Sequence, residues 1–240
     1  MVAQTLLVPV VFPDPDSYPL DDENIVGFSG FDVVLFGYWE VPDGVSSETA
    51  RAEHEADAQA VLYEMAAQFS RGGASTSVQL HFGPGGAEAA ALQDRIAAAT
   101  DADAVLVGGR ITMWSNVLVP LRDARRRAEL VAFLSGLDVD SIFTLELFHA
   151  AADPSDVDAA RETLASVRAA LVEEGFAADA VDVTVEVHED AGRAIAERAR
   201  RHNLVVVGET EELDDDAKFI GPTSEAVLDR TDTSVVVLRE

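Results

Sequence analysis

Apolar and polar positions follow two recurring patterns along this chain. Short runs rich in valine, leucine and phenylalanine predict buried strands over residues 6–11, 31–40, 77–82, 104–108, 117–121, 142–149, 181–187, 204–208 and 234–238. Between these runs, stretches with apolar residues at helical spacing or with helix-start and helix-stop residues predict helices over 46–71, 87–100, 123–137, 154–174, 190–202 and 223–230. Strands that alternate with helices of this length are typical of βαβ units. We therefore expect a doubly wound α/β fold whose parallel sheet is covered on both faces.

The pattern occurs twice. Residues 6–10 (LLVPV) return as residues 117–121 (VLVPL), and residues 104–108 (AVLVG) return as residues 204–208 (LVVVG). This similarity predicts a tandem duplication with a first domain at residues 1–115 and a second at residues 116–240. Only residues 110–115 separate the fourth strand of the first repeat from the first strand of the second. The first repeat is thus expected to be truncated and degenerate, without the last helix and strand of the second.

Three short motifs together resemble the universal stress protein family. A strand ends in Val119-Pro120, a fourth strand ends in Val207-Gly208, and a further glycine, Gly221, follows after a loop. The layout is similar to the tandem-domain haloarchaeal form of the family. The resemblance implies two Rossmann-like domains of the adenine nucleotide alpha hydrolase-like type. It also implies a site for ATP or AMP with Mg²⁺, because nucleotide-binding members carry G-x2-G-x9-G-[ST] after the fourth strand.

The same resemblance gives the candidate binding residues: Val119, Pro120, Arg122, Gly208, Glu209, Gly221, Thr223 and Ser224. Several departures weaken the nucleotide interpretation. Glu211 stands at the middle glycine position, Pro222 follows Gly221, and Arg122 stands where the family has its adenine-contacting aspartate. A carboxylate repels phosphate, and proline removes a main-chain N–H that would otherwise donate to it. We expect lost or weakened ATP binding and no catalytic residues, with ATP or AMP binding through the second-domain loop as the alternative.

Charge gives the second strong signal. The chain has 44 acidic and 17 basic residues, a net charge of −27, and Lys218 as its single lysine. A disordered acidic tail, a site for cations or a basic partner, and a surface adapted to high salt would each explain this balance. The acids are spread along helices and turns, which favours the halophilic surface. A nucleic-acid partner is excluded, because no basic stripe would neutralise the phosphates.

Other candidate chemistry is sparse. The chain contains no cysteine and no His-Glu-x-x-His motif, and we expect no metal site, although the acidic run at residues 209–216 has carboxylates that suit Mg²⁺ or Ca²⁺. His149 and His188 end neighbouring predicted strands, so an acid–base pair in the crevice is a second possibility. No apolar run is long enough for a membrane span, and no signal peptide is recognisable.

These observations define the expected function. We predict a cytoplasmic, non-catalytic regulatory or stress-response module of a halophile, whose two halves pack as a pseudo-dimer around their terminal strands. The strand at residues 234–238 is expected to present an exposed edge, and a homodimer through that edge follows from it. The family resemblance adds a transporter or a regulatory protein as a possible partner.

Overall fold

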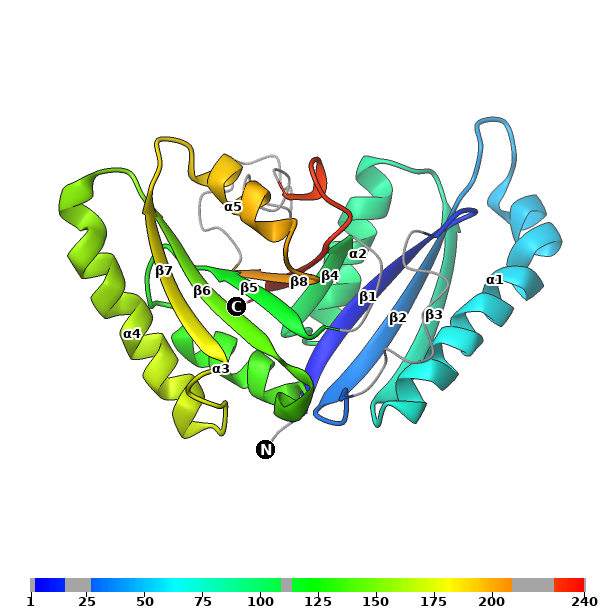
Figure 1. Cartoon of the computed structure of the whole chain (residues 1–240). Helices are drawn as coiled ribbons and strands as arrows, with labels where there is room; N and C mark the ends of the chain where they lie inside the picture. Colours follow the sequence, from blue (N-terminus) through cyan, green and yellow to red (C-terminus); the bar gives the residue numbers. More distant parts are fainter. Residues whose placement is uncertain (1–2, 16–26, 109–113, 209–226, 240) are drawn as a thin grey trace.

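The chain forms one mixed β-sheet with helices on both faces (Figure 1). The computed structural model describes residues 3–15, 27–108, 114–208 and 227–239. Its strands are β1 (Gln4–Phe12), β2 (Phe31–Glu40), β3 (Ser75–Gly83), β4 (Ala104–Gly108), β5 (Asn116–Pro120), β6 (Thr144–Ala151), β7 (Val181–Val187), β8 (Leu204–Gly208) and β9 (Ser234–Leu238). This architecture confirms the predicted doubly wound α/β fold. Within the described ranges, no helix combines the length and the apolar character needed to cross a membrane.

The strand order shows how the two repeats join. The nine strands run β3-β2-β1-β4-β9-β8-β5-β6-β7. Both repeats thus place their strands in the same relative order, and all neighbours are parallel except β4 and β9, which pair antiparallel. Among the described residues of the first repeat, no strand follows β4 before β5, and β9 of the second repeat supplies the neighbour of β4. Without β9, the main-chain groups of β4 would face the middle of the molecule unpaired.

The expectation of a free edge at residues 234–238 is wrong. One side of β9 pairs with β4, with Leu238 opposite Ala104, and the other side pairs with β8, with Ser234 opposite Leu204. All five residues of β9 are buried. The strand that was expected to join two copies of the chain therefore joins the two repeats of one copy.

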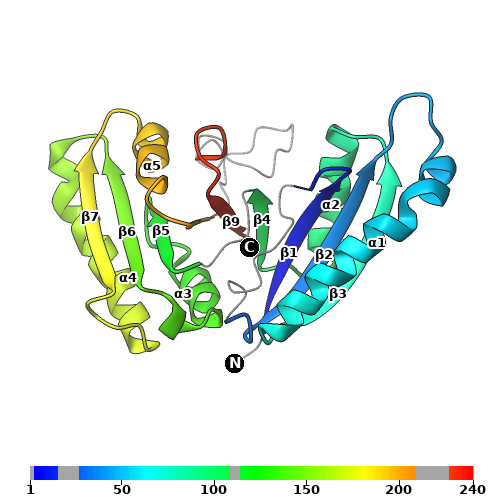
Figure 2. The same cartoon turned by 45° about the vertical axis from the view of Figure 1, so that its right-hand side comes forward.

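Helices cover the two faces differently (Figure 2). One face carries α1 (Ser47–Arg71), α3 (Arg127–Gly136) and α4 (Val157–Glu173), and the other carries α2 (Ala87–Ala99) and α5 (Ala191–Ala199). The single-turn 3-10 helices η1 (Val139–Ser141) and η2 (Pro154–Asp156) precede β6 and α4. On the three-helix face, one apolar core runs through both repeats and includes Leu6, Phe69, Phe133 and Leu164. Under α2 and under α5 lie two further clusters.

Aromatic side chains fill the junction between the repeats. The ring centroids of Phe28 and Trp114 lie 5.1 Å apart, and those of Phe31 and Phe133 lie 5.3 Å apart. The main-chain carbonyl of Gly27 accepts a 3.0 Å hydrogen bond from the N–H of Asp138. The segment before β2 thus contacts the α3 region of the other repeat, and the continuous core makes the two repeats one packed unit.

One helix begins later than the sequence predicts. The helix expected from residue 123 starts at Arg127, because the Asp123 carboxylate accepts the main-chain N–H of Arg125 at 2.9 Å. An aspartate that binds the N–H two residues ahead forms a turn that competes with the helix. The chain between β5 and α3 therefore makes a tight turn at the carboxyl end of β5.

Candidate functional site

The predicted site lies where β5 and β8 end. These strands are parallel neighbours, so Pro120 and Gly208 reach the same edge of the sheet. Pro120 pairs with Phe148 of β6, and Gly208 pairs with Leu238 of β9. Val119 is fully buried in the core shared by the two repeats, so its side chain is structural. The carboxyl ends of strands in open α/β sheets are where ligands bind, so this edge is the first place to look for a site.

The polar residues after β5 bind one another. Arg122 is exposed. Asp123, the nearest carboxylate to the family's aspartate position, accepts the Arg125 main-chain N–H at 2.9 Å and the Arg125 Nε–H at 2.8 Å. The main-chain hydrogen bond and, after it, the Arg125 guanidinium lower the pKa of Asp123 in spite of partial burial. This carboxylate is therefore already occupied within its own turn.

An arginine covers the strand-end glycine. A Cβ atom on Gly208 would lie 2.8 Å from Cδ and 3.4 Å from Nε of Arg126. In phosphate-binding loops, glycine at this place lets a phosphate approach the main chain closely. Here the stem of Arg126 fills the space that Gly208 leaves open. In the sequence, Arg126 is part of the compact basic cluster Arg125-Arg126-Arg127, for which pairing with local acids is expected. Its position next to Gly208 depends on the turn after β5 and was not predicted.

The other half of the predicted site follows β8 in the sequence. Glu209, Gly221, Thr223 and Ser224, together with the acidic run at residues 209–216, lie outside the described residues. Within the described ranges, no group of three or more acidic or histidine side chains has the arrangement of a metal site. In the first repeat, the corresponding strand-end glycine is Gly108, where an added Cβ would lie 2.7 Å from Cδ2 of Leu228.

The two strand-end histidines have separate local partners. Nδ1 of His149 lies 2.8 Å from the carbonyl oxygen of Leu121. Nδ1 of His188 accepts the main-chain N–H of Asp190 at 3.0 Å. Each ring thus stabilises a turn at the carboxyl edge of the sheet, and these contacts explain both positions without a shared proton.

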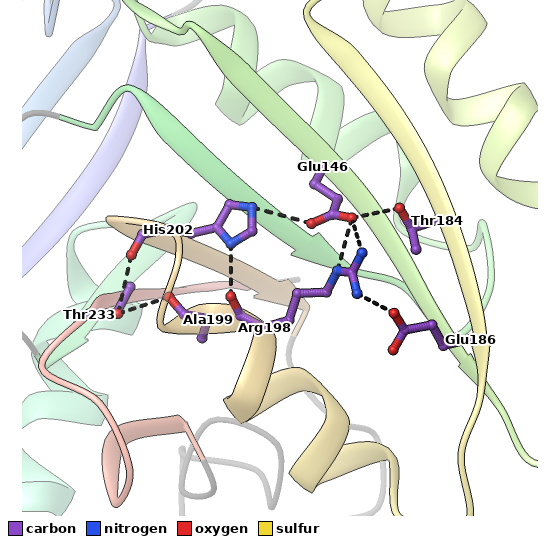
Figure 3. Close-up of polar contacts among 7 residues, drawn as sticks. All are labelled: Glu146, Thr184, Glu186, Arg198, Ala199, His202 and Thr233. Atoms are coloured by element: carbon purple, nitrogen blue, oxygen red, sulfur yellow. Dashed lines mark hydrogen bonds and ion pairs between the residues drawn. The ribbon is translucent and has the colours of Figure 1, made fainter.

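A cluster of charged side chains beneath α5 was missed by the sequence analysis (Figure 3). Glu146 of β6 accepts hydrogen bonds from Thr184 of β7 at 2.6 Å and from Nε of Arg198 of α5 at 2.9 Å. Nη2 of Arg198 lies 2.7 Å from the same carboxylate, and its Nη1 pairs with Glu186 of β7. The guanidinium also lies 4.9 Å from the centroid of the Phe148 ring. Arg198 therefore ties α5 to two neighbouring strands.

Histidine and threonine extend the cluster to the end of α5. Nδ1 of His202 lies 3.0 Å from the carbonyl oxygen of Arg198, and Nε2 lies 3.4 Å from Glu146. Both ring nitrogens of His202 therefore face acceptor oxygens. The Thr233 hydroxyl lies 3.2 Å from the Ala199 carbonyl oxygen and 3.3 Å from that of His202.

The electrostatics of this cluster indicate a structural role. Burial by itself raises the pKa of Glu146, but hydrogen bonds from His202, Arg198 and Thr184 outweigh it and hold the pKa far below its usual range. The hydrogen bond to Glu146 raises the pKa of Arg198. Glu146 and Arg198 both stay charged near neutral pH, and their hydrogen bonds fix α5 on the sheet. Two features of the sequence could have indicated this cluster: Glu146 lies within an apolar strand, and Arg198 and His202 have i,i+4 spacing.

Comparison with known proteins gives structural neighbours. No protein-family model and no curated protein match the sequence. Among solved structures, a universal stress protein from Archaeoglobus fulgidus aligns with 100% of this chain and 97% of its own length, at a TM-score of 0.60 and 13% identity. The chain has the universal stress protein fold. A functionally unknown protein from Pseudomonas aeruginosa aligns with 99% of this chain and 92% of its own length, at a TM-score of 0.55 and 16% identity. A second Pseudomonas aeruginosa structure, which carries the universal stress protein name, covers 99% of this chain and 93% of its own, at a TM-score of 0.52 and 17% identity.

Proposed function

We propose that this protein is a non-catalytic regulatory or stress-response module of the universal stress protein family, acting in the cytoplasm of a halophile. In this proposal its ATP binding is lost or weakened, and it acts by contacting another protein, such as a transporter or a regulator. The fold over the full length of the chain supports the family assignment. The repeated motifs support a division into residues 1–115 and 116–240.

The observation that carries the loss of nucleotide binding is the position of Arg126 against Gly208. A phosphate can approach a strand-end glycine only where no side chain lies over its Cα atom. The Arg126 stem lies there, 2.8 Å from the site of a Cβ. The adenine side of the site is altered as well, because the Asp123 carboxylate binds Arg125 and Arg122 occupies the family's aspartate position.

The first repeat is even less suited to binding a phosphate at its strand-end glycine. Its strand-end glycine, Gly108, lies against the side chain of Leu228 from the second repeat, with 2.7 Å between a built Cβ and the leucine Cδ2. An apolar side chain at this place provides no donor for a phosphate. This contact supports the interpretation of the first repeat as a degenerate copy whose function is to complete the sheet and the shared core.

The halophilic part of the proposal rests on charge. A net charge of −27 on 240 residues destabilises a compact chain in dilute buffer through self-repulsion. In about 1 M salt the screening length falls to about 3 Å, which removes most of this repulsion. A cytoplasm with molar salt is therefore the environment in which this surface is compatible with a stable fold.

Calorimetry with ATP and Mg²⁺ in molar KCl tests the loss of nucleotide binding. We expect the wild-type protein to show no binding in the micromolar range. Two variants make the result specific: Arg126→Ala uncovers Gly208, and Arg127→Ala, which removes an exposed arginine next to it, is the matched control. If Arg126 blocks the site, Arg126→Ala gains binding and Arg127→Ala does not. Micromolar binding by the wild type would overturn the proposal in favour of an ATP- or AMP-binding protein.

A further inference from the structure

The two outer strands of the sheet, β3 and β7, differ in how their edges are protected. They lie at opposite ends of the nine-stranded sheet (Figures 1 and 2). An outer strand presents N–H and C=O groups without a strand partner, and these groups can pair with another chain. Proteins usually protect such an edge with charges, with short or irregular strands, or by covering it with another part of the chain.

β7 has this protection. Its seven residues include the exposed Asp182 and Glu186. From α4, the Nε–H of Arg168 donates to the Val181 carbonyl at 2.9 Å, and Nη2 donates to the Ala178 carbonyl. Two carboxylates and an arginine bound to the main chain make β7 a poor partner for another strand.

β3 is longer than β7, uncharged and regularly paired. Its nine residues, STSVQLHFG, contain no acidic residue, lysine or arginine, and all nine pair in unbroken register with β2. The sequence between Arg71 and Glu88 is the longest interval of the chain without such a charge. The side chains of β3 on the α2 side, among them the exposed Ser75 and Ser77, are small or polar.

We propose that β3 pairs with β3 of a second copy of this chain, antiparallel about a two-fold axis, so that the sheet continues across the dimer. Two-fold symmetry brings the same strand together from both copies, and the pairing is then self-complementary. The charge of the chain favours this edge over other surfaces. Two molecules of net charge −27 repel each other, and β3 itself contributes no carboxylate to this repulsion.

The partner is a second copy because the nine residues of β3 include no acidic residue, lysine or arginine that would recognise an acidic or basic protein. A regular strand of this length offers main-chain hydrogen bonds and uncharged side chains, which an identical strand matches. This interface is independent of ATP binding, so its test does not depend on the proposed function. It also differs from the interface expected at residues 234–238, since β9 is fully paired within one chain.

Cysteine cross-linking tests the proposal directly, because the natural sequence has no cysteine. Ser75→Cys, Ser77→Cys and Gln79→Cys place single thiols along β3, and Val187→Cys places one at the half-exposed end of β7 as the matched control. In molar KCl we expect light scattering to give twice the mass of one chain for the wild type. We expect oxidation to cross-link one β3 position strongly and its neighbours less, since identical residues meet only near the two-fold axis. A monomeric wild type, or equal cross-linking of Val187→Cys, would overturn the proposal.

Charge on the edge provides a second, independent measurement. The double variant Ser77→Glu with Gln79→Glu puts four carboxylates into the paired strands of a dimer. We expect it to be monomeric while its far-UV circular dichroism matches the wild type, and we expect Val187→Glu to remain dimeric. A double variant that keeps the wild-type mass would show that another surface joins the copies.

Discussion

Replacing Glu146 by glutamine tests whether the charged cluster beneath α5 stabilises the fold. The variant keeps the size of the side chain but removes the negative charge that Arg198 and His202 share. The side chains of Glu146 and Arg198 are 12% and 17% exposed, so the variant leaves a largely buried guanidinium without its main partner. Glu186 remains as a second partner of Arg198, but its side chain is 47% exposed.

The size of the effect follows from this geometry. Removing one partner of a buried ion pair costs about 3–5 kcal/mol. Because Glu186 stays and glutamine still accepts a hydrogen bond, we expect the lower end, about 3 kcal/mol of unfolding free energy. For a chain of this length, 1 kcal/mol corresponds to about 2–4 °C in Tm, which gives a decrease of roughly 6–12 °C.

Thermal unfolding followed by circular dichroism measures this decrease. The matched control is Glu197→Gln, because Glu197 pairs with Arg193 at 2.8 Å in an exposed i,i+4 bridge whose side chains are 51% and 61% exposed. Molar KCl screens the exposed pair but much less the buried one. We therefore expect the Glu146→Gln decrease to persist at high salt, whereas Glu197→Gln stays close to the wild type.

The pH dependence adds a second measure of the same cluster. The folded state lowers the pKa of Glu146, so its contribution is complete above the unfolded-state pKa of about 4.3 and is lost as the pH falls below it. The difference between the wild type and Glu146→Gln should thus be full at neutral pH and shrink below about pH 4. An equal effect of the two variants, or a difference that disappears in molar KCl at neutral pH, would refute the reasoning.

Two further predictions concern charge and sheet pairing. The Tm of the wild type should rise steadily from dilute buffer to molar KCl, because salt screens the repulsion among 44 acidic residues. Thermal melting at a series of KCl concentrations measures this rise, and a Tm that does not depend on salt would contradict the halophilic interpretation. Residues 116–240 expressed alone should dimerise, because β9 then loses β4 and exposes one edge. This fragment lacks β3, so a dimer would have to form without the β3 interface. A monomeric mass in light scattering would show that the exposed edge of β9 is not sufficient for dimerisation.

Much of the secondary structure could be predicted from local sequence. The strands at residues 31–40, 181–187, 204–208 and 234–238 have the predicted bounds, because runs of branched and aromatic residues favour strands whatever surrounds them. The predicted start of α3 was wrong for a local reason as well. The Asp123 carboxylate accepts the N–H of Arg125, and the helix therefore begins only after this turn. Turn geometry of this kind is weakly encoded and needs coordinates to be recognised.

The candidate site was less accessible to sequence reasoning. The position of Pro120 and Gly208 on neighbouring strand ends follows from the repeat and the fold class. That Arg126 covers Gly208, and that Glu146 meets Arg198 from a helix 52 residues away, depends on how α3 and α5 lie on the sheet. Hydrophobic periodicity predicts which face of a helix or strand is buried. It does not predict which side chain of another element contacts that face.

The sequence by itself determined the repeated motifs, the alternation of strands and helices, the short interval after the fourth strand of the first repeat and the acidic composition. Each of these is a property of composition or of short-range pattern. Only the tertiary structure decided what completes the first repeat, because pairing between β4 and β9 joins residues far apart in the chain. A hydrophobic run in the sequence indicates that a strand is buried. It does not indicate which strand pairs with it, because that depends on which main-chain N–H and C=O groups of the folded sheet would otherwise stay unpaired.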